Sequence, residues 1–151
     1  MIKKLVMALF VVSALVGCSD SGNKEVTVDQ ARLITDTTLG GKPAVSMSLS
    51  EGSHDNYMSV TFAKRIVDVG KIKSEKREQT QLISMSVDWD GKHYVESSKH
   101  DTWSSVKVSK KPDGVEVSVS GRFVRAATDE YIDVSPSTLM IEGSDVELIT
   151  N

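Results

Sequence analysis

One stretch alternates apolar and polar side chains without a fault: Ile83-Ser84-Met85-Ser86-Val87-Asp88-Trp89. A period of two is the pattern of a β-strand with one buried face, because successive side chains along a strand point to opposite faces. The dipeptide Asp90-Gly91 follows directly, and it favours a type I′ turn that reverses the chain into a hairpin. The stretch therefore predicts a strand and the start of its antiparallel neighbour.

The same alternation recurs in both directions from this stretch. It is regular over residues 45–50, 58–62 and 115–119, and a further arm is expected at residues 93–95. Residues 26–34 predict a weaker strand, because the pattern slips between Val28 and Leu33 and so indicates a β-bulge. Residues 139–141 and 146–149 are expected to supply the last one or two strands. Phe62, Trp89 and Phe123 are in phase with the core.

Turn residues separate the predicted strands. Residues 39–43 hold two glycines and Pro43, which fits only at the start of a strand or on an edge. Residues 111–114 place proline and glycine as in a type I turn that closes on a left-handed Gly114. This turn is expected to join residues 106–110 and 115–124 into the longest hairpin of the chain, with a bend or bulge at Gly121.

Only residues 70–81 have no clear assignment. They contain good helix formers without an apolar stripe, and a loop, a strand extension and a short surface helix all fit. Many short strands without a long helix predict an all-β fold. We expect an antiparallel β-sandwich of about seven to nine strands, immunoglobulin-like or transthyretin-like in architecture, with a small closed β-barrel as the alternative.

The amino terminus carries a different signal. Lys3 and Lys4 precede an apolar run over residues 5–16, which is too short to span a bilayer as a helix. The run ends in Leu15-Val16-Gly17-Cys18, which resembles the lipobox of bacterial lipoproteins. The resemblance implies that the thiol of Cys18 receives a diacylglycerol, that the chain is cut before Cys18, and that the new amino terminus is acylated.

This resemblance divides the chain into a signal peptide (1–17), an acylated tether (18–24) and a single domain (25–151). Cleavage would leave 134 residues with a side-chain charge of −5, which argues against nucleic acid as a partner. Cys18 is the only cysteine, so we expect no disulfide. In lipoproteins of enteric bacteria an aspartate after the cysteine is associated with inner-membrane retention. Ser19 stands there instead, so we expect attachment to the outer membrane, facing the periplasm.

No motif of an enzyme or a metal site is complete in the sequence. Aligning Gly91 with the invariant glycine of a calcium loop puts serines at two ligand positions, so that Asp88-Trp89-Asp90-Gly91 is better explained as a hairpin turn. The histidines are His54, His93 and His100, and a metal or acid-base site would need two of them, or one and a carboxylate, to converge. His54 and His93 are explained as surface polar residues of a turn and a strand. We therefore expect no catalytic residue, no metal and no cofactor.

Two features of the sequence indicate candidate partner-binding surfaces. Residues 64–77 are basic and residues 129–147 are acidic, and these segments face each other, are simply solvated, or bind a partner. The basic candidates are Lys64, Arg65, Lys71, Lys73, Lys76 and Arg77. Hydroxyl side chains also occupy the outward strand positions. They are either ordinary strand formers on a solvent-exposed face or a flat surface that another protein can cover at a small cost of desolvation. These residues are Ser46, Ser48, Ser50, Ser59, Thr61, Ser84, Ser86 and Ser118.

The leading hypothesis is a membrane-anchored periplasmic lipoprotein that acts as a non-enzymatic protein-binding or envelope-assembly module. It would have two partners, the membrane through its lipid anchor and an envelope protein. The first alternative is a hydrolase or metal-dependent enzyme with its site in the loops. The second is a carrier of an apolar ligand, which requires an internal cavity.

Overall fold

The structure is a computed structural model that describes residues 23–52, 55–74, 81–125 and 127–151. The described elements are β1 (Asn23–Val26), β2 (Gln30–Leu39), β3 (Lys42–Ser50), β4 (Tyr57–Ala63), a 3₁₀ turn (Lys64–Ile66), β5 (Lys71–Lys73), β6 (Ile83–Trp89), β7 (Lys92–Val95), β8 (Trp103–Lys111), β9 (Gly114–Arg125), β10 (Glu130–Ile141) and α1 (Asp145–Thr150). Within these residues no helix is long and apolar enough to cross a membrane.

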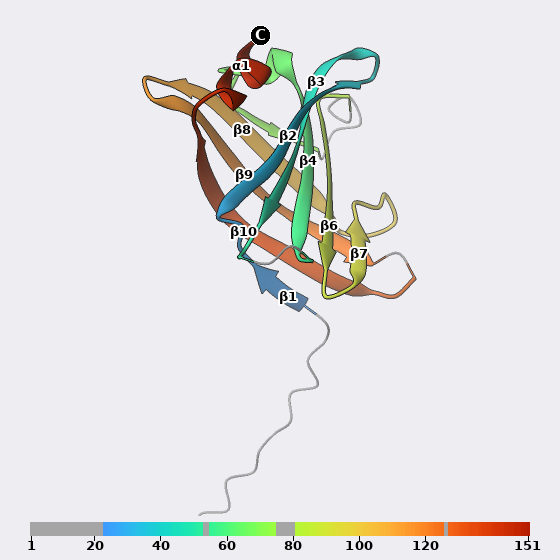
Figure 1. Cartoon of the computed structure of the whole chain (residues 1–151). Helices are drawn as coiled ribbons and strands as arrows, with labels where there is room; N and C mark the ends of the chain where they lie inside the picture. The colour runs from blue at the N-terminus through green and yellow to red at the C-terminus, as the bar shows by residue number, and fades with distance from the viewer. Residues whose placement is uncertain (1–22, 53–54, 75–80, 126) are drawn as a thin grey trace, which may run out of the picture.

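The strands form one mixed sheet of ten strands, which curls into a half-barrel (Figure 1). Its order is β1-β10-β9-β7-β6-β4-β3-β2, while β8 pairs with β9 and β5. Among the pairings of the described strands, only that of β1 with β10 is parallel, and the others are antiparallel. The all-β prediction is confirmed. The strand order does not confirm a sandwich of two separate sheets, because one continuous ladder runs from β1 to β2.

The period of two located most strands correctly. The prediction for residues 83–89 coincides with β6, and residues 45–50, 58–62, 106–110 and 115–124 lie inside β3, β4, β8 and β9. The expected bulge in the weak strand is confirmed, since the pairing of β2 with β3 shifts between Ala31 and Ile34. That strand is nevertheless divided, because residues 27–29 separate β1 from β2. Asn23 and Lys24, expected in the tether, belong to β1.

At the end of the chain, the strand expected at residues 139–141 is confirmed, whereas the strand expected at residues 146–149 and the expected longest hairpin were wrong. Residues 139–141 are only the last part of β10, a strand of twelve residues whose pairing with β9 is longer than the β8–β9 hairpin. Residues 146–149 belong to α1 instead of a strand. Gly143 has a positive φ of 72° and ends the extended chain, after which Val146 and Ile149 lie one helical turn apart and both pack against the core.

The turns show two different reasons for a glycine. Asp90 and Gly91 have φ values of 52° and 71°, which confirms the type I′ hairpin between β6 and β7. Gly114 was expected to be left-handed, and this was wrong, because its φ is not among the positive values. A Cβ on Gly114 would lie 2.1 Å from the carbonyl oxygen of Ile141, so glycine is required there by the close approach of β10.

The core lies inside the curl of the sheet and is filled by aliphatic, methionine and aromatic side chains. Phe62 and Phe123 are fully buried and Trp89 is 5% exposed, as the strand phase predicted. The predicted irregularity at Gly121 lies in the partner strand, where the pairing shifts between Val134 and Ser137. A Cβ on Gly121 would lie 2.6 Å from the Phe123 ring, so the ring occupies the space that glycine leaves.

The two kinds of glycine predict different responses to asparagine, which tolerates a left-handed backbone but carries a Cβ. Gly114→Asn should lower the free energy of unfolding by about 1–3 kcal/mol, because the side chain clashes with the backbone of β10. Gly91→Asn should lower it by less than about 1 kcal/mol, since a Cβ at that position would meet no atom within 4 Å. Urea unfolding of both variants measures the difference, and equal losses would contradict it.

Candidate functional site

The two ends of the half-barrel differ in what they carry. At one end, the Lys24 ammonium of β1 pairs with the carboxylate of Asp90 and lies 6.0 Å from the centre of the Trp89 ring. The backbone N–H of Asp90 also donates to the Asn56 side chain at 2.8 Å, which fixes the β6–β7 turn to the segment before β4. The helix α1 and the carboxyl terminus lie at the opposite end (Figure 1).

Glu130 organises the end where β1 begins. Its carboxylate accepts hydrogen bonds from the Lys92 ammonium at 2.6 Å and from the Tyr94 hydroxyl at 3.0 Å. The hydrogen bond from Lys92, followed by that from Tyr94, lowers the pKa of Glu130 below its ordinary value of 4.5. Burial, reinforced by the Glu130 carboxylate, raises the pKa of Tyr94 to about 12. These charges are satisfied within the protein, so the cluster is a structural fastening.

The basic candidates are spread over several elements. The Lys64 ammonium is mostly buried and pairs with Asp36 of β2 at 2.6 Å. Arg65, Lys71 and Lys73 are exposed, and Lys71 lies opposite Lys107 across the β5–β8 pairing. Lys76 and Arg77 lie outside the described residues, as does Cys18. The exposed lysines on β5 and β8 therefore form a small positive area, from which Lys64 is excluded by its ion pair.

Acids of the segment 129–147 pair with other bases. Asp129 contacts His100, Glu130 contacts Lys92, and Asp133 lies 3.8 Å from Arg122. Glu142 and Asp145 lie at the other end of β10, beside α1. The acidic segment is thus divided between the two ends of the half-barrel.

A row of polar groups that sequence reasoning missed joins Ser97, His100 and Asp129. The imidazole contacts the Ser97 hydroxyl at 2.9 Å through Nδ1 and the Asp129 carboxylate at 3.2 Å through Nε2. Ser97 also accepts the backbone N–H of Lys99, so its hydroxyl closes its own turn. The Asp129 side chain is 90% exposed, which leaves the row without the water-excluded setting that activates a serine. The row of hydrogen bonds fixes the turn at residues 97–100 to the loop before β10.

The remaining metal hypotheses find no support among the described residues. No group of three or more His, Cys, Asp or Glu side chains is arranged there to hold an ion. Asp88 contacts His93 at 2.9 Å, and Asp90 is bonded to Lys24 and Asn56. The aspartates considered for a calcium loop therefore have other partners. His54 lies outside the described residues.

The structure gathers most of the hydroxyl candidates on the outer face of β3, β4 and β6, which we call the hydroxyl face. Six of them form two rows across the three strands: Ser46, Thr61 and Ser84 in one row, and Ser48, Ser59 and Ser86 in the other. The Thr61 hydroxyl donates to Ser46 at 3.2 Å. Ser50 is fully buried and Ser118 lies on β9, so neither belongs to this face.

An exposed apolar residue borders the hydroxyl face. Leu33 lies in the bulge of β2 and its surface is 64% exposed. It lines a hollow of about 320 Å³ together with Tyr57 and hydroxyl residues of β2, β3 and β4. The face therefore combines uncharged hydroxyls with an exposed leucine at its margin.

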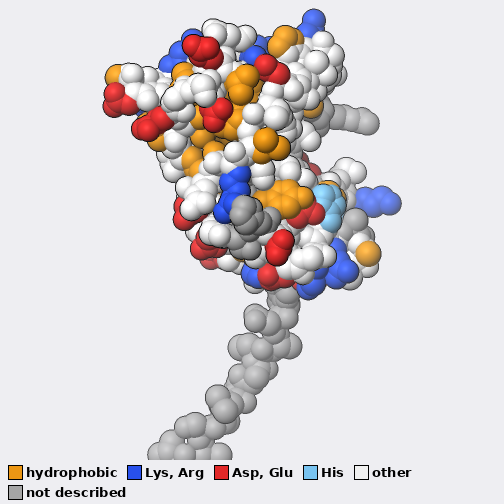
Figure 2. All heavy atoms as spheres, viewed as in Figure 1, with side chains coloured by type: hydrophobic (Ala, Val, Ile, Leu, Met, Phe, Trp, Pro, Cys, Tyr) orange, Lys and Arg blue, Asp and Glu red, His pale blue; other side chains and the backbone are white. Residues whose placement is uncertain are grey.

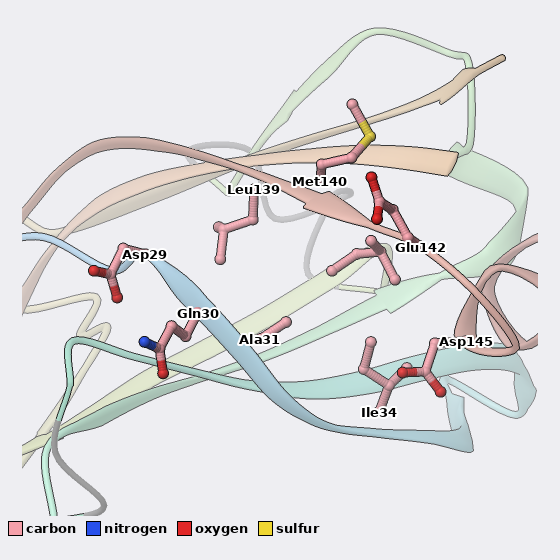
Figure 3. Close-up of a pocket in the computed structure, with 9 residues that line it drawn as sticks. Asp29, Gln30, Ala31, Ile34, Leu139, Met140, Glu142 and Asp145 are labelled. Atoms are coloured by element: carbon pink, nitrogen blue, oxygen red, sulfur yellow. The ribbon is translucent and has the colours of Figure 1, made fainter. Parts of the chain in front are cut away.

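A second hollow lies between β2 and the end of β10, and we call it the edge groove. It has a volume of about 440 Å³. Apolar side chains form its floor and acids stand around it (Figure 2). Its lining residues are Asp29, Gln30, Ala31, Ile34, Leu139, Met140, Ile141, Glu142 and Asp145. In Figure 3, Leu139 projects into the gap between the two strands, whereas Met140 points away from it.

Comparison of the sequence and the structure with known proteins finds no relative. No family model, no curated protein and no solved structure matches the chain. The function therefore has to be argued from these surfaces alone.

Glu130 predicts a pH dependence of stability. Because its pKa is lowered in the folded state, its contribution is present above the unfolded pKa and is lost as the pH falls through the folded pKa. Glu130→Gln should therefore be less stable than the wild type at about pH 7, and the difference should close in acid well below pH 4.5. Urea midpoints across this range provide the measurement. Asp113→Asn, in the exposed β8–β9 turn, is the control and should show no such closing gap.

Proposed function

We propose that the protein is a lipid-anchored lipoprotein of the bacterial outer membrane that faces the periplasm and binds another envelope protein without catalysing a reaction. The anchor is supported by the resemblance of residues 15–18 to a lipobox. The binding role is supported by the surfaces of the half-barrel. The position of β1 favours an arrangement in which one end of the domain is near the membrane and the other is free for a partner.

The observation that carries the proposal is the hydroxyl face with Leu33 at its margin. Hydroxyls that bond to one another, as Thr61 and Ser46 do, lose little on desolvation when a partner covers them. A large exposed apolar residue beside such a surface is a suitable anchor for an interface core. The face carries no charged side chain in its two rows, whereas solvent-facing sheet surfaces are usually charged.

The tether is short relative to the domain. An acylated Cys18 would precede β1 by five residues, a span of at most about 18 Å when extended. The β6–β7 turn, to which β1 is fastened through Lys24, would then lie near the membrane. The hydroxyl face lies on β3, β4 and β6 at the side of the half-barrel, and the edge groove lies beside α1. Both surfaces would then be accessible from the periplasm.

The alternatives have less support. An apolar carrier needs an internal cavity, but the inside of the curl is filled by buried side chains such as Phe62, Met58 and Phe123. A hydrolase would use the row of Ser97, His100 and Asp129, whose serine is held within its own turn. The protein-binding module needs neither a cavity nor an activated nucleophile.

Lipidation has a direct test. Cys18→Ser should abolish incorporation of a radiolabelled fatty acid and leave the precursor uncut, because serine does not supply the acceptor thiol. Ser19→Ala is the matched control and should be labelled like the wild type. Label that persists in Cys18→Ser would refute the anchor.

The hydroxyl face is tested with a photo-crosslinking amino acid in the full chain expressed in its native envelope. Placed at Ser84, it should yield a discrete adduct, and placed at the exposed Lys107 on β8 it should yield none. Adding Ser59→Lys should remove the adduct, because it places a charge in the middle of the face.

Ser118→Lys is the matched control, since it introduces the same charge at a hydroxyl position on β9. It should leave the adduct at Ser84 unchanged. No adduct at Ser84, or an adduct that is insensitive to Ser59→Lys, would refute binding by this face.

A further inference from the structure

Two strand edges face the edge groove without pairing across it. In the described part of the chain β2 pairs only with β3. β1 pairs with β10 over Tyr131–Val134, so that Ser137–Ile141 pair only with β9. An unpaired edge presents backbone N–H and C=O groups that can accept another strand. The groove is thus bordered by two such edges, one on each side.

The side chains of the groove suit an extended segment. Leu139 and Ile141 are almost fully buried, while Ala31 and Ile34 are partly buried and continue the apolar surface toward solvent. On the β2 side, the lining residues run from Asp29, which precedes β2, to Ile34, and these six positions correspond to about 20 Å of extended chain. A strand of five or six residues fits this length, with alternate side chains pointing onto the apolar floor.

Acids stand at both ends of the groove (Figure 3). Asp29 precedes β2 at one end, while Glu142 and Asp145 lie near α1 at the other. The ion pairs of the described residues include none of these three acids, and no base is among the lining residues. The base of β2, Arg32, directs its Nε toward Ser50 at 2.6 Å. The groove is therefore negatively charged and suits a cationic ligand.

We propose that the edge groove binds an extended, basic segment of the partner protein, which adds as a strand between β2 and β10. This inference rests on the proposed function and names the chemistry of the partner: apolar side chains alternating with lysine or arginine. Backbone pairing supplies affinity, and the acids select for cationic residues. A second copy of this chain is a poorer occupant, because its own groove carries the same acids and the two grooves would bring like charges together.

The test uses the full chain in detergent and a synthetic hexapeptide of alternating lysine and valine. Fluorescence anisotropy should show binding that weakens with salt. A glutamate–valine peptide of equal length should bind at least about tenfold more weakly. Equal binding of both peptides would overturn the proposal, and so would an oligomer of the chain that forms through the groove and excludes the peptide.

Glu142→Lys reverses an exposed charge at the rim and should weaken binding of the lysine–valine peptide at least about fivefold. Asp113→Lys is the matched control, because it changes the charge of an exposed turn at the same end of the half-barrel but does not line the groove. It should leave the affinity within about twofold of the wild type. Equal losses of affinity in the two variants would show that the peptide is attracted by net charge alone, and would overturn the proposal that it binds in the groove.

Hydrogen exchange tests strand addition itself. Binding should slow exchange of backbone amides in residues 30–35 and 137–142, because a new strand pairs with both edges. Unchanged exchange at both edges would overturn the proposal even if the peptide binds.

The photo-crosslink at Ser84 separates the two proposals. If Glu142→Lys removes or weakens the adduct, the groove and the hydroxyl face serve one partner. If the adduct persists at full strength with Glu142→Lys, the protein-binding function stands and the groove is not its site. Absence of the adduct in the wild type counts against the proposed function, whatever the peptide does.

Discussion

The curl of the sheet depends on the close packing of β9 against three neighbours. This twelve-residue strand pairs with β10 along one edge and with β8 and then β7 along the other. Gly121 leaves room for the Phe123 ring, and the irregularity of the β9–β10 pairing lies in β10, between Val134 and Ser137. A side chain at position 121 would force the ring or the β8 backbone to move. This part of the half-barrel therefore depends on one long strand and on its glycine.

The curl stops before the barrel closes. At one end of the sheet order, β1 covers the first part of β10 and leaves the rest of that edge unpaired. At the other end, β2 has no second neighbour among the described strands. The helix α1 lies where the two edges diverge, with Ile149 buried in the core. The edge groove follows from this geometry. The short helix α1 covers the core but does not pair with the edge N–H and C=O groups of β2 or β10.

The sequence predicted the strands because their one-sided burial imposes a period of two that can be read locally. It failed at residues 146–149, where apolar residues in a short segment suit a strand as well as one helical turn, and the positive φ of Gly143 decides between them. Gly114 was misread because its constraint comes from Ile141, a residue far along the chain. The edge groove could not be predicted either, since its two walls are joined only by the curl of the sheet.

The distribution of ion pairs separates the two ends of the half-barrel. Near the start of β1, charges are matched within the protein: Lys24 with Asp90, and Glu130 with Lys92 and Arg125. A fastening of this kind holds β1 against the β6–β7 turn and leaves little charge to attract a partner. At the groove, Asp29, Glu142 and Asp145 have no counter-ion within the described ion pairs. The like charges around this hollow repel one another. A cationic strand would gain the backbone pairing and would also relieve this repulsion, whereas an apolar segment of the same shape would gain the backbone pairing alone.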